Sequence, residues 1–388
     1  MKRDSSSKKQ QVTIREVAAK AHVSLSTVSR VMRNPANVPE PTVTKVRAAA
    51  KELNYIYNAM AGSLSSRRSN TIGVLLPSSA FWPFGANLMA IQNVCMEKNF
   101  SCRVAMQQFS PELERRAMRR FHEQRIGGLI LVGLDQSNLS SLYELEESGV
   151  PCIMLWETLE EKLNYVAIDN FRAAYNGIRY FIDLNHERIG LLMGSSKCAH
   201  RNHERLRGYR QALQDHGMPY DPALVQASLP TLLQGREGIR ALLRLNSPPT
   251  AVLCATDYLA IGAMRGIHDA GLRVPDDISV CGFDDAELSS YFIPPITTIK
   301  TPCYEMGEIA TTKLIEALEN QVPLDVHYIL DTEMLIRSTV ARQRSTPAVP
   351  MPLQQAQTQK LEGTEPQRKN FPEPAGEYDI SPEQAHGK

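Results

Sequence analysis

The chain has 388 residues, of which 43% are hydrophobic and 22% are charged. This composition excludes a fibrous or wholly disordered protein, and the length favours two or three globular domains. The net charge is only +1, but residues 1–70 carry 13 Lys and Arg against 4 Asp and Glu, whereas residues 71–388 carry 30 against 38. A basic head on an acidic body is typical of a small polyanion-binding module joined to a domain that does not bind polyanions.

The N-terminal sequence MKRDSSSKKQQ is basic and polar and lacks the apolar centre of a secretory signal. No run approaches the roughly 18 apolar residues that a membrane-spanning helix requires. The seven cysteines are scattered without a CxxC pair, which indicates reduced thiols. We therefore expect a cytoplasmic protein without a membrane partner, with a disordered basic arm over residues 1–11.

The first predicted elements are two short helices within residues 12–33. Thr13 and Glu16 have the spacing of a capping box at the start of the first helix, and Ser24 is placed to cap the second. Both helices have one apolar face at helical spacing, and the second also has a polar, cationic face. The apolar faces comprise Ile14, Val17, Ala18 and Ala21 in the first helix and Val28, Val31 and Met32 in the second, and the polar face comprises Ser26, Ser29, Arg30 and Arg33.

Two short helices with a tight connection predict a helix-turn-helix whose second helix enters the major groove of DNA. An ordinary amphipathic helix pair with a solvated charged face is the alternative interpretation of this pattern. Pro39 and Pro41 mark the start of a third helix, so we expect an all-α DNA-binding domain over residues 12–56. The polar residues 57–70 form a predicted hinge or linker.

From Thr71 onward, short apolar runs alternate with segments of helical period, which predicts parallel sheets with helices on both faces. There are too many such elements for one sheet, so we expect an α/β body of two lobes with a cleft over residues 71–340. Residues 341–388 are rich in Pro, Gln and Glu and are expected to be disordered. The predicted strands lie at 72–76, 102–106, 127–133, 151–156, 165–168, 188–193, 251–255, 278–283 and 297–299.

No catalytic motif of the GxSxG, Walker A or HExxH type occurs, and we expect neither an enzyme nor a cofactor. Cys198, His200 and His203 form a C-x-H-x-x-H cluster, but its spacing fits no common zinc site, so no metal is expected. A small-molecule receptor without a DNA function is the remaining alternative class. The basic head argues against it.

Several segments resemble, in order and spacing, the LacI/GalR (lactose-repressor/galactose-repressor) family of bacterial transcription regulators. The resemblance covers residues 12–340 and implies a periplasmic-binding-protein-like two-lobed body, a homodimer or higher oligomer, and double-stranded operator DNA as a partner. It also implies a small-molecule effector in the cleft that controls repression. A sugar or sugar derivative is the first expectation, and a regulator of nucleoside or purine metabolism is the alternative. The matching segments are VTIREVAAKAHVSLSTVSRVMRNPANVP, SNTIGVLLP, RLRGYRQAL, PPTAVLCATDYLAIGAMR, GLRVPDDISVCGFDD and PPITTIK.

Carried over residue by residue, the resemblance implies base contacts from Leu25 and Ser26 and a base or phosphate contact from Arg30. Leu64 matches a leucine that the family wedges into the minor groove, which unstacks and kinks the central base step. Tyr57 and Gly62 depart from the family's hinge, so we expect a hinge that is helical only when bound. The remaining expected DNA contacts are Thr13, Ser24, Thr27, Ser29 and Asn58.

In the body, Arg205 matches a family arginine that reaches a ligand hydroxyl or carboxylate, and Asp284 matches an acidic ligand contact. Asp169 is expected near the same cleft, and Thr256 stands where many members have Asn. The charged residues could instead pair with other charges. Four aromatic residues could stack on a sugar ring or base, or simply pack in the core: Phe81, Trp82, Phe84 and Trp156. Of these, Phe84 and Trp156 complete the expected effector set.

Overall fold

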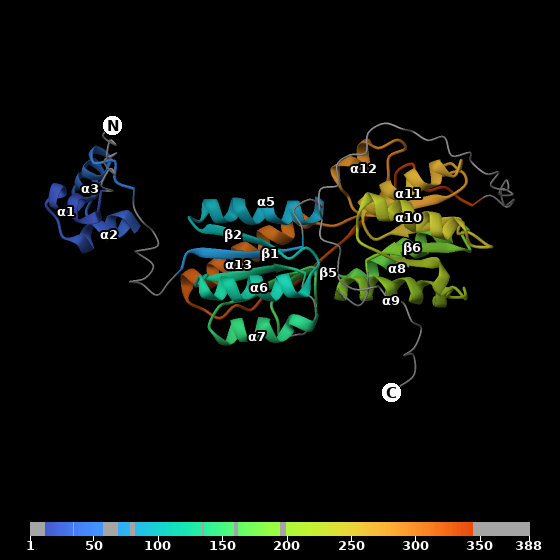
Figure 1. The fold of residues 1–388 in the computed structure, drawn as a ribbon, viewed down its shortest axis with the longest axis horizontal. Coiled ribbons are helices and arrows are strands. Elements are labelled where there is room, and N and C mark those ends of the chain that lie inside the picture. Colours follow the sequence, from blue (N-terminus) through green and yellow to red (C-terminus); the bar gives the residue numbers. More distant parts are fainter. Residues whose placement is uncertain are drawn as a thin grey trace, which may run out of the picture. The chain divides into compact units, whose positions relative to one another are not determined.

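The structure is a computed structural model that describes most of the head and body of the chain (Figure 1). The chain divides into two compact units, Met1–Thr71 and Ile72–Lys388. The expected basic arm, Asn58 and Leu64 of the predicted hinge, and the C-terminal tail lie outside the described residues. The described residues are 12–33, 35–56, 69–77, 82–133, 136–158, 162–194 and 199–343.

The described part of the head contains three α-helices, α1 (Ile14–Ala21), α2 (Leu25–Arg33) and α3 (Glu40–Glu52), with a short 3-10 turn at Pro35–Asn37. The backbone amide of Thr13 donates to the Glu16 carboxylate at 2.7 Å, which is the carboxylate half of the predicted capping box. This hydrogen bond lowers the pKa of Glu16. The Thr27 amide donates to Ser24 Oγ at 3.1 Å, so Ser24 caps α2 as predicted.

A small apolar core holds the three helices of the head together, and it contains the faces that the sequence predicted. Burial of these side chains turns the opposite face of α2 toward solvent, where Leu25, Ser26 and Arg30 are exposed. The predicted helix-turn-helix is therefore confirmed as a fold. Its core comprises Val17, Ala18, Ala21, Val28, Val31, Val43, Val46, Ala49 and Ala50.

The described part of the body contains two six-stranded sheets, which define an N-lobe with strand order β11–β5–β4–β3–β1–β2 and a C-lobe with order β12–β10–β9–β8–β6–β7. Neighbouring strands such as β1 and β3 or β8 and β9 pair in parallel, whereas β10 and β12 pair antiparallel. The strands are β1 (Thr71–Leu76), β2 (Ser101–Met106), β3 (Gly128–Val132), β4 (Cys152–Leu155), β5 (Tyr165–Ile168), β6 (Ile189–Met193), β7 (Val225–Ala227), β8 (Ala251–Cys254), β9 (Ser279–Asp284), β10 (Thr297–Lys300), β11 (His327–Leu330) and β12 (Glu333–Leu335).

Helices cover both faces of each sheet, because successive residues of a strand point to opposite faces. In β1, Val74 belongs to the core under α5 and α13, whereas Leu75 belongs to the core under α6 and α7. In the C-lobe, α8 and α9 pack together, and so do α10 and α11. The helices are α5 (Trp82–Glu97), α6 (Pro111–Glu123), α7 (Leu139–Glu147), α8 (Asn170–Asp183), α9 (His200–Asp215), α10 (Leu232–Leu243), α11 (Asp257–Asp269), α12 (Glu287–Tyr291) and α13 (Cys303–Asn320).

Within the described residues, the chain passes between the lobes three times, at 168–170, 300–303 and 330–333. The predicted fold class, a helix-turn-helix head with a two-lobed, doubly wound α/β body, is confirmed. None of the described helices has both the length and the apolar character needed to cross a membrane. We expect a ligand to bind at the boundary between the lobes, because parallel sheets bind ligands at the carboxyl ends of their strands.

Candidate functional site

The N-terminal end of α2 presents a compact set of hydroxyl groups beside an apolar side chain. Ser24 Oγ lies 2.8 Å from both Ser26 Oγ and Thr27 Oγ1. Leu25, next to them, keeps 45% of its surface exposed. Arg30, one turn further along, forms no ion pair with any residue in the described part of the chain. Hydroxyl donors at a helix N-terminus suit a phosphate, and an exposed arginine suits a phosphate or a guanine edge.

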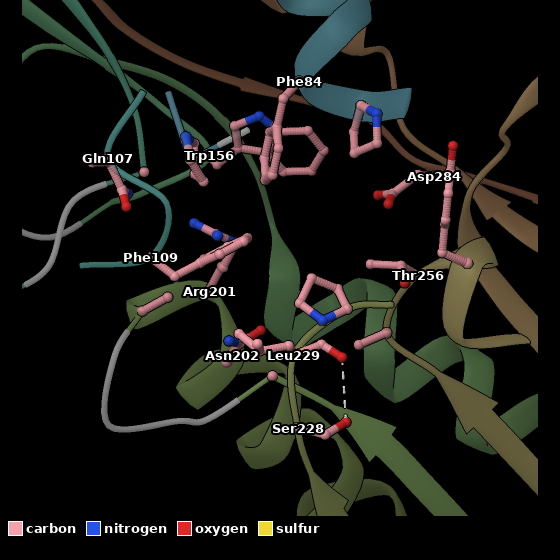
Figure 2. Close-up of a pocket in the computed structure, with 18 of the residues that line it drawn as sticks. Phe84, Gln107, Phe109, Trp156, Arg201, Asn202, Ser228, Leu229, Thr256 and Asp284 are labelled. Atoms are coloured by element: carbon pink, nitrogen blue, oxygen red, sulfur yellow. Dashed lines mark hydrogen bonds between the residues drawn. The ribbon is translucent and has the colours of Figure 1, made fainter. Parts of the chain in front are cut away.

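A cavity lies between the two lobes of the body (Figure 2). Its lining is built from residues that end or immediately follow strands of both sheets, which is where parallel sheets place ligand-binding groups. Each lobe therefore supplies one wall. The strand-end residues are Pro77, Gln107, Gly133 and Trp156 from the N-lobe and Gly194, Ser228, Ala255 and Asp284 from the C-lobe.

Most of the effector residues predicted from sequence meet in this cavity. Its lining includes Phe84, Trp156, Arg205, Thr256 and Asp284. Thr256 also caps α11, since its hydroxyl accepts from the Leu259 amide at 3.2 Å. Their contact with an effector stays a prediction.

Asp169 does not belong to that lining, although the sequence placed it near the cleft. Its side chain is exposed at the start of α8, where the carboxylate accepts a hydrogen bond from the Arg172 amide at 2.8 Å. Asp169 therefore acts as a helix cap in this structure.

Arg205 lies deeply buried in the floor of the cavity, with 4% of its surface exposed. Its Nε donates to Asn170 Oδ1 at 2.9 Å and its Nη1 donates to the Ala255 carbonyl at 2.7 Å. The guanidinium also stacks over the Phe283 ring, 3.7 Å from its centre. Burial lowers the pKa of Arg205 to about 10, while Asp284 opposes that change, so the side chain remains a cation at neutral pH.

Asp284, at the end of β9, has a left-handed backbone with φ of 99° and a buried side chain. Its Oδ1 atom has no hydrogen-bond partner in the part of the chain that the structure describes. Burial raises the pKa of Asp284 to about 7, and the positive charge of Arg205 limits that rise. The buried Oδ1 atom can accept a hydrogen bond from a ligand.

Arg201 and Glu157 join the two lobes beside the cavity. The Arg201 amide donates to Glu157 Oε2 at 2.9 Å, and Arg201 Nη1 donates to Glu157 Oε1 at 2.5 Å. Glu157 is fully buried and follows β4 of the N-lobe, whereas Arg201 lies in the first turn of α9 in the C-lobe. Their ion pair neutralises both charges across the lobe boundary.

Phe84 and Trp156 form an aromatic wall in the N-lobe part of the cavity. Their rings meet edge to face, with centroids 6.2 Å apart and an interplanar angle of 80°. Trp156 Nε1 donates to Asn87 Oδ1 at 2.8 Å, which fixes the indole. This wall offers an apolar surface to a ring-shaped ligand.

The sequence prediction missed three polar residues of the cavity lining, Gln107, Arg201 and Asn202, and the buried Glu157 that pairs with Arg201. Gln107 directly follows the strand predicted at 102–106, and this position at a strand end could have identified it as a cavity residue. Arg201 follows His200, which the sequence analysis considered only as part of the C-x-H-x-x-H cluster, so Arg201 itself was not singled out. Cys198 of that cluster falls outside the described residues, and no group of three or more potential metal ligands occurs among the residues that are described.

Comparison with family models matches both parts of the chain. Residues 13–58 match the model described as bacterial regulatory proteins, lacI family, and residues 178–340 match a periplasmic binding protein-like domain. The first match contains the helix-turn-helix, and the second contains most of the C-lobe.

Known relatives extend the similarity over most of the chain. The HTH-type transcriptional repressor CytR of Escherichia coli (strain K12) is 32% identical over 328 residues, covering 84% of this chain and 96% of that protein. The ribose operon repressor of Haemophilus influenzae is 30% identical and covers 84% of this chain and 98% of its own length. The crystal structure of the lac repressor dimer bound to operator and the anti-inducer ONPF superposes with a TM-score of 0.75 at 31% identity, covering 86% of this chain and 100% of that one.

Proposed function

Because the chain belongs to the lacI family of bacterial regulatory proteins, we propose that it is a ligand-responsive transcriptional repressor that binds a two-fold symmetric operator as a dimer. It is a DNA-binding regulator and not an enzyme. One observation carries this conclusion: a single chain combines a helix-turn-helix with an exposed polar α2 face and a two-lobed body with a polar cavity at its strand ends. Operator binding requires access to the chromosome, so the proposal places the protein in the cytoplasm.

On the DNA side, Leu25, Ser26 and Arg30 of α2 read base edges, and the remaining predicted residues hold phosphates. The 45% exposure of Leu25 supports an apolar contact, such as one with a thymine methyl group. The shared hydroxyl cluster at Ser24 supports a phosphate contact at the helix start. The phosphate set is Thr13, Ser24, Thr27, Ser29 and, in the hinge outside the described residues, Asn58, where Leu64 would insert into the minor groove.

Dimerisation would use exposed apolar side chains of the body. On the C-lobe, Leu288, Tyr291 and Ile293 are exposed around α12, and Tyr291 and Ile293 retain 78% and 91% of their surface. Exposed large apolar side chains that cluster on a protein surface mark protein–protein contacts. A second copy of the chain would cover them and would set the spacing of the two recognition helices.

The effector would bind in the interlobe cavity and shift the protein between DNA-competent and DNA-incompetent states. It can shift that equilibrium only by the difference between its affinities for the two states. Similarity to the ribose operon repressor supports a sugar-utilisation operon as the target. The aromatic wall of Phe84 and Trp156 equally supports a nucleoside, which is the alternative effector.

Selection from a library of random DNA duplexes with the full chain tests the DNA-binding part of this function. We expect an enriched inverted repeat, because two α2 helices of a symmetric dimer contact two equivalent half-sites. Arg30→Ala should lose about tenfold or more in affinity for the selected site, as a bidentate arginine–guanine pair contributes about 1–3 kcal/mol. An enriched motif without two-fold symmetry, or equal affinity for selected and random duplexes, would contradict the proposal.

A further inference from the structure

The two ends of the interlobe cavity each carry a buried acceptor atom that has no hydrogen-bond partner among the described residues. These are Oε1 of Gln107 and Oδ1 of Asp284. Gln107 belongs to the N-lobe wall and Asp284 to the C-lobe wall, and Figure 2 shows them on opposite sides of the cavity with Phe84 and Trp156 between them. Buried polar atoms in folded proteins almost always have a partner, so two exceptions facing one cavity point to missing donors on a ligand.

The backbone holds Gln107 firmly at its position. Its amide donates to the Leu76 carbonyl at 3.0 Å, and its carbonyl accepts from the Ser110 amide at 2.8 Å. The residue therefore stands at the end of β2 with its backbone bound on both sides, and only its side chain remains to interact. Asp284 is equally constrained, since it pairs with Lys300 in the register of β9 and β10.

Both arginines of the cavity lining already interact with protein groups. Arg201 is bound to the buried carboxylate of Glu157. Arg205 uses two of its donors on Asn170 and Ala255 and faces the negative charge of Asp284. The lining includes the further buried carboxylate of Glu114. An anionic ligand would therefore enter a site whose positive charges have partners and whose acceptors would repel it.

We propose that the effector is an uncharged molecule that donates one hydrogen bond to Gln107 in the N-lobe and one to Asp284 in the C-lobe, and that Gln107 is a specificity-determining residue. This inference rests on the proposed function, because it takes the cavity as the effector site. A neutral sugar or nucleoside has hydroxyl or amino donors at both ends. A sugar acid or phosphate ester of the same skeleton replaces a donor with a negative charge.

Matched pairs of ligands test the selectivity. The probes are glucose with glucuronate, ribose with ribose 5-phosphate, and uridine with uridine 5′-monophosphate, each titrated into the full chain by calorimetry. We expect binding from an uncharged member and at least 100-fold weaker binding from its anionic partner. Tighter binding of the anionic member in any pair would overturn the inference.

Gln107→Met tests the residue itself, because Met keeps the length of the side chain and removes both polar atoms. The variant should bind the uncharged ligand at least tenfold more weakly while its operator affinity without ligand stays unchanged. Gln214→Met is the control, since Gln214 is exposed on α9 and the same substitution there should change neither affinity. Unchanged ligand affinity of Gln107→Met would overturn the role of Gln107.

The proposed function fails in a distinguishable way. If the uncharged ligand binds and Gln107→Met weakens it, but operator affinity does not depend on the ligand, the chemistry of the cavity stands and the regulatory function does not. If the ligand changes operator affinity and Gln107→Met binds it as the parent does, the regulatory function stands and this inference fails.

Discussion

At the residue scale, Asp284 has a buried carboxyl group that lowers the stability of the ligand-free protein, as expected of the effector contact that we propose for it. The folded protein buries its carboxyl among Arg205, Arg201 and Asp257, and burial raises its pKa to about 7. Oδ1 gains no protein hydrogen bond in return. Binding sites commonly hold such groups at some cost to the stability of the ligand-free protein.

The pH dependence of this cost follows from the direction of the pKa change. Between about pH 4 and pH 7 the folded protein keeps a proton on Asp284 that the unfolded chain releases, so the contribution of this group to stability falls across that window and levels off above it. Asp284→Asn removes the titration, and Asn tolerates the left-handed backbone. We expect the ligand-free variant to match the parent near pH 4 and to gain up to about 4 kcal/mol in free energy of unfolding at pH 8.

Denaturant unfolding at both pH values measures this difference, and the variant should at the same time lose its response to effector. Asp285→Asn is the matched control, because Asp285 accepts a hydrogen bond from Arg337 at 2.7 Å in an ion pair. Loss of that pair should lower stability rather than raise it. A variant at residue 284 that is no more stable at pH 8 than the parent would show that the carboxylate is not strained.

The sequence predicted five residues of the cavity lining and missed others, charged and uncharged alike. Arg205 and Asp284 lie in motifs that resemble a known family, and the structure brings both to the cavity. Gln107 and Glu157 lie outside any motif. Their role depends on strand ends from both sheets meeting at one place, which spacing along the chain does not encode. Asp169 was predicted near the cavity but does not line it, because its carboxylate caps the start of α8.

At the element scale, apolar runs predicted the buried strands and the edge strand β2 but missed the other three edge strands, β7, β11 and β12. β11 is mostly exposed and β12 is three residues long, so neither contains a continuous apolar run. β7 is equally short and only partly buried. Edge strands are paired on one side only, and their side chains need not be apolar. The pattern therefore indicates the central strands of each sheet more reliably than its outer strands.

Close helix packing in the C-lobe depends on glycine at one position of α10. A Cβ atom at Gly235 would lie 2.3 Å from the Leu259 carbonyl oxygen of α11, whereas a Cβ atom at Gly238 of the same helix would lie 3.1 Å from the end of the Leu192 side chain. Backbone cannot move aside as a leucine methyl can. The contact of α10 with α11 therefore requires glycine at 235 but not at 238.

Alanine at each of these two positions provides a matched pair of tests. Both substitutions gain up to about 1 kcal/mol of helix propensity. Gly235→Ala should nevertheless lower the free energy of unfolding of the body by about 1–3 kcal/mol through overpacking, whereas Gly238→Ala should change it by less than about 1 kcal/mol. Both tryptophans of the chain lie in the body, so their fluorescence during denaturant unfolding reports this unit alone. Equal effects of the two substitutions would contradict the packing interpretation.

At the scale of the whole molecule, the head binds DNA and the body binds the effector. The equilibrium between DNA-competent and DNA-incompetent states must couple these two functions. The head exposes Leu25, Ser26 and Arg30 on α2, and these three predicted contacts are few for one half-site. Selectivity must then come from pairing two such helices in a dimer and from the hinge. The body decides when both helices engage, because an effector that spans Gln107 and Asp284 contacts both lobes and favours the arrangement in which they are close.

The most direct test of this coupling measures operator affinity by fluorescence anisotropy with and without a saturating uncharged ligand from the matched panel. For the parent protein we expect a ligand-dependent change of about 5- to 150-fold, the usual range of allosteric coupling. Arg205→Ala should bind operator as the ligand-free parent does and should no longer respond to ligand. Arg207→Ala, an exposed residue of α9 that pairs with Glu204, should respond as the parent does. A full response from Arg205→Ala, or operator affinity of the parent that ligand leaves unchanged, would contradict control of DNA binding by the interlobe cavity.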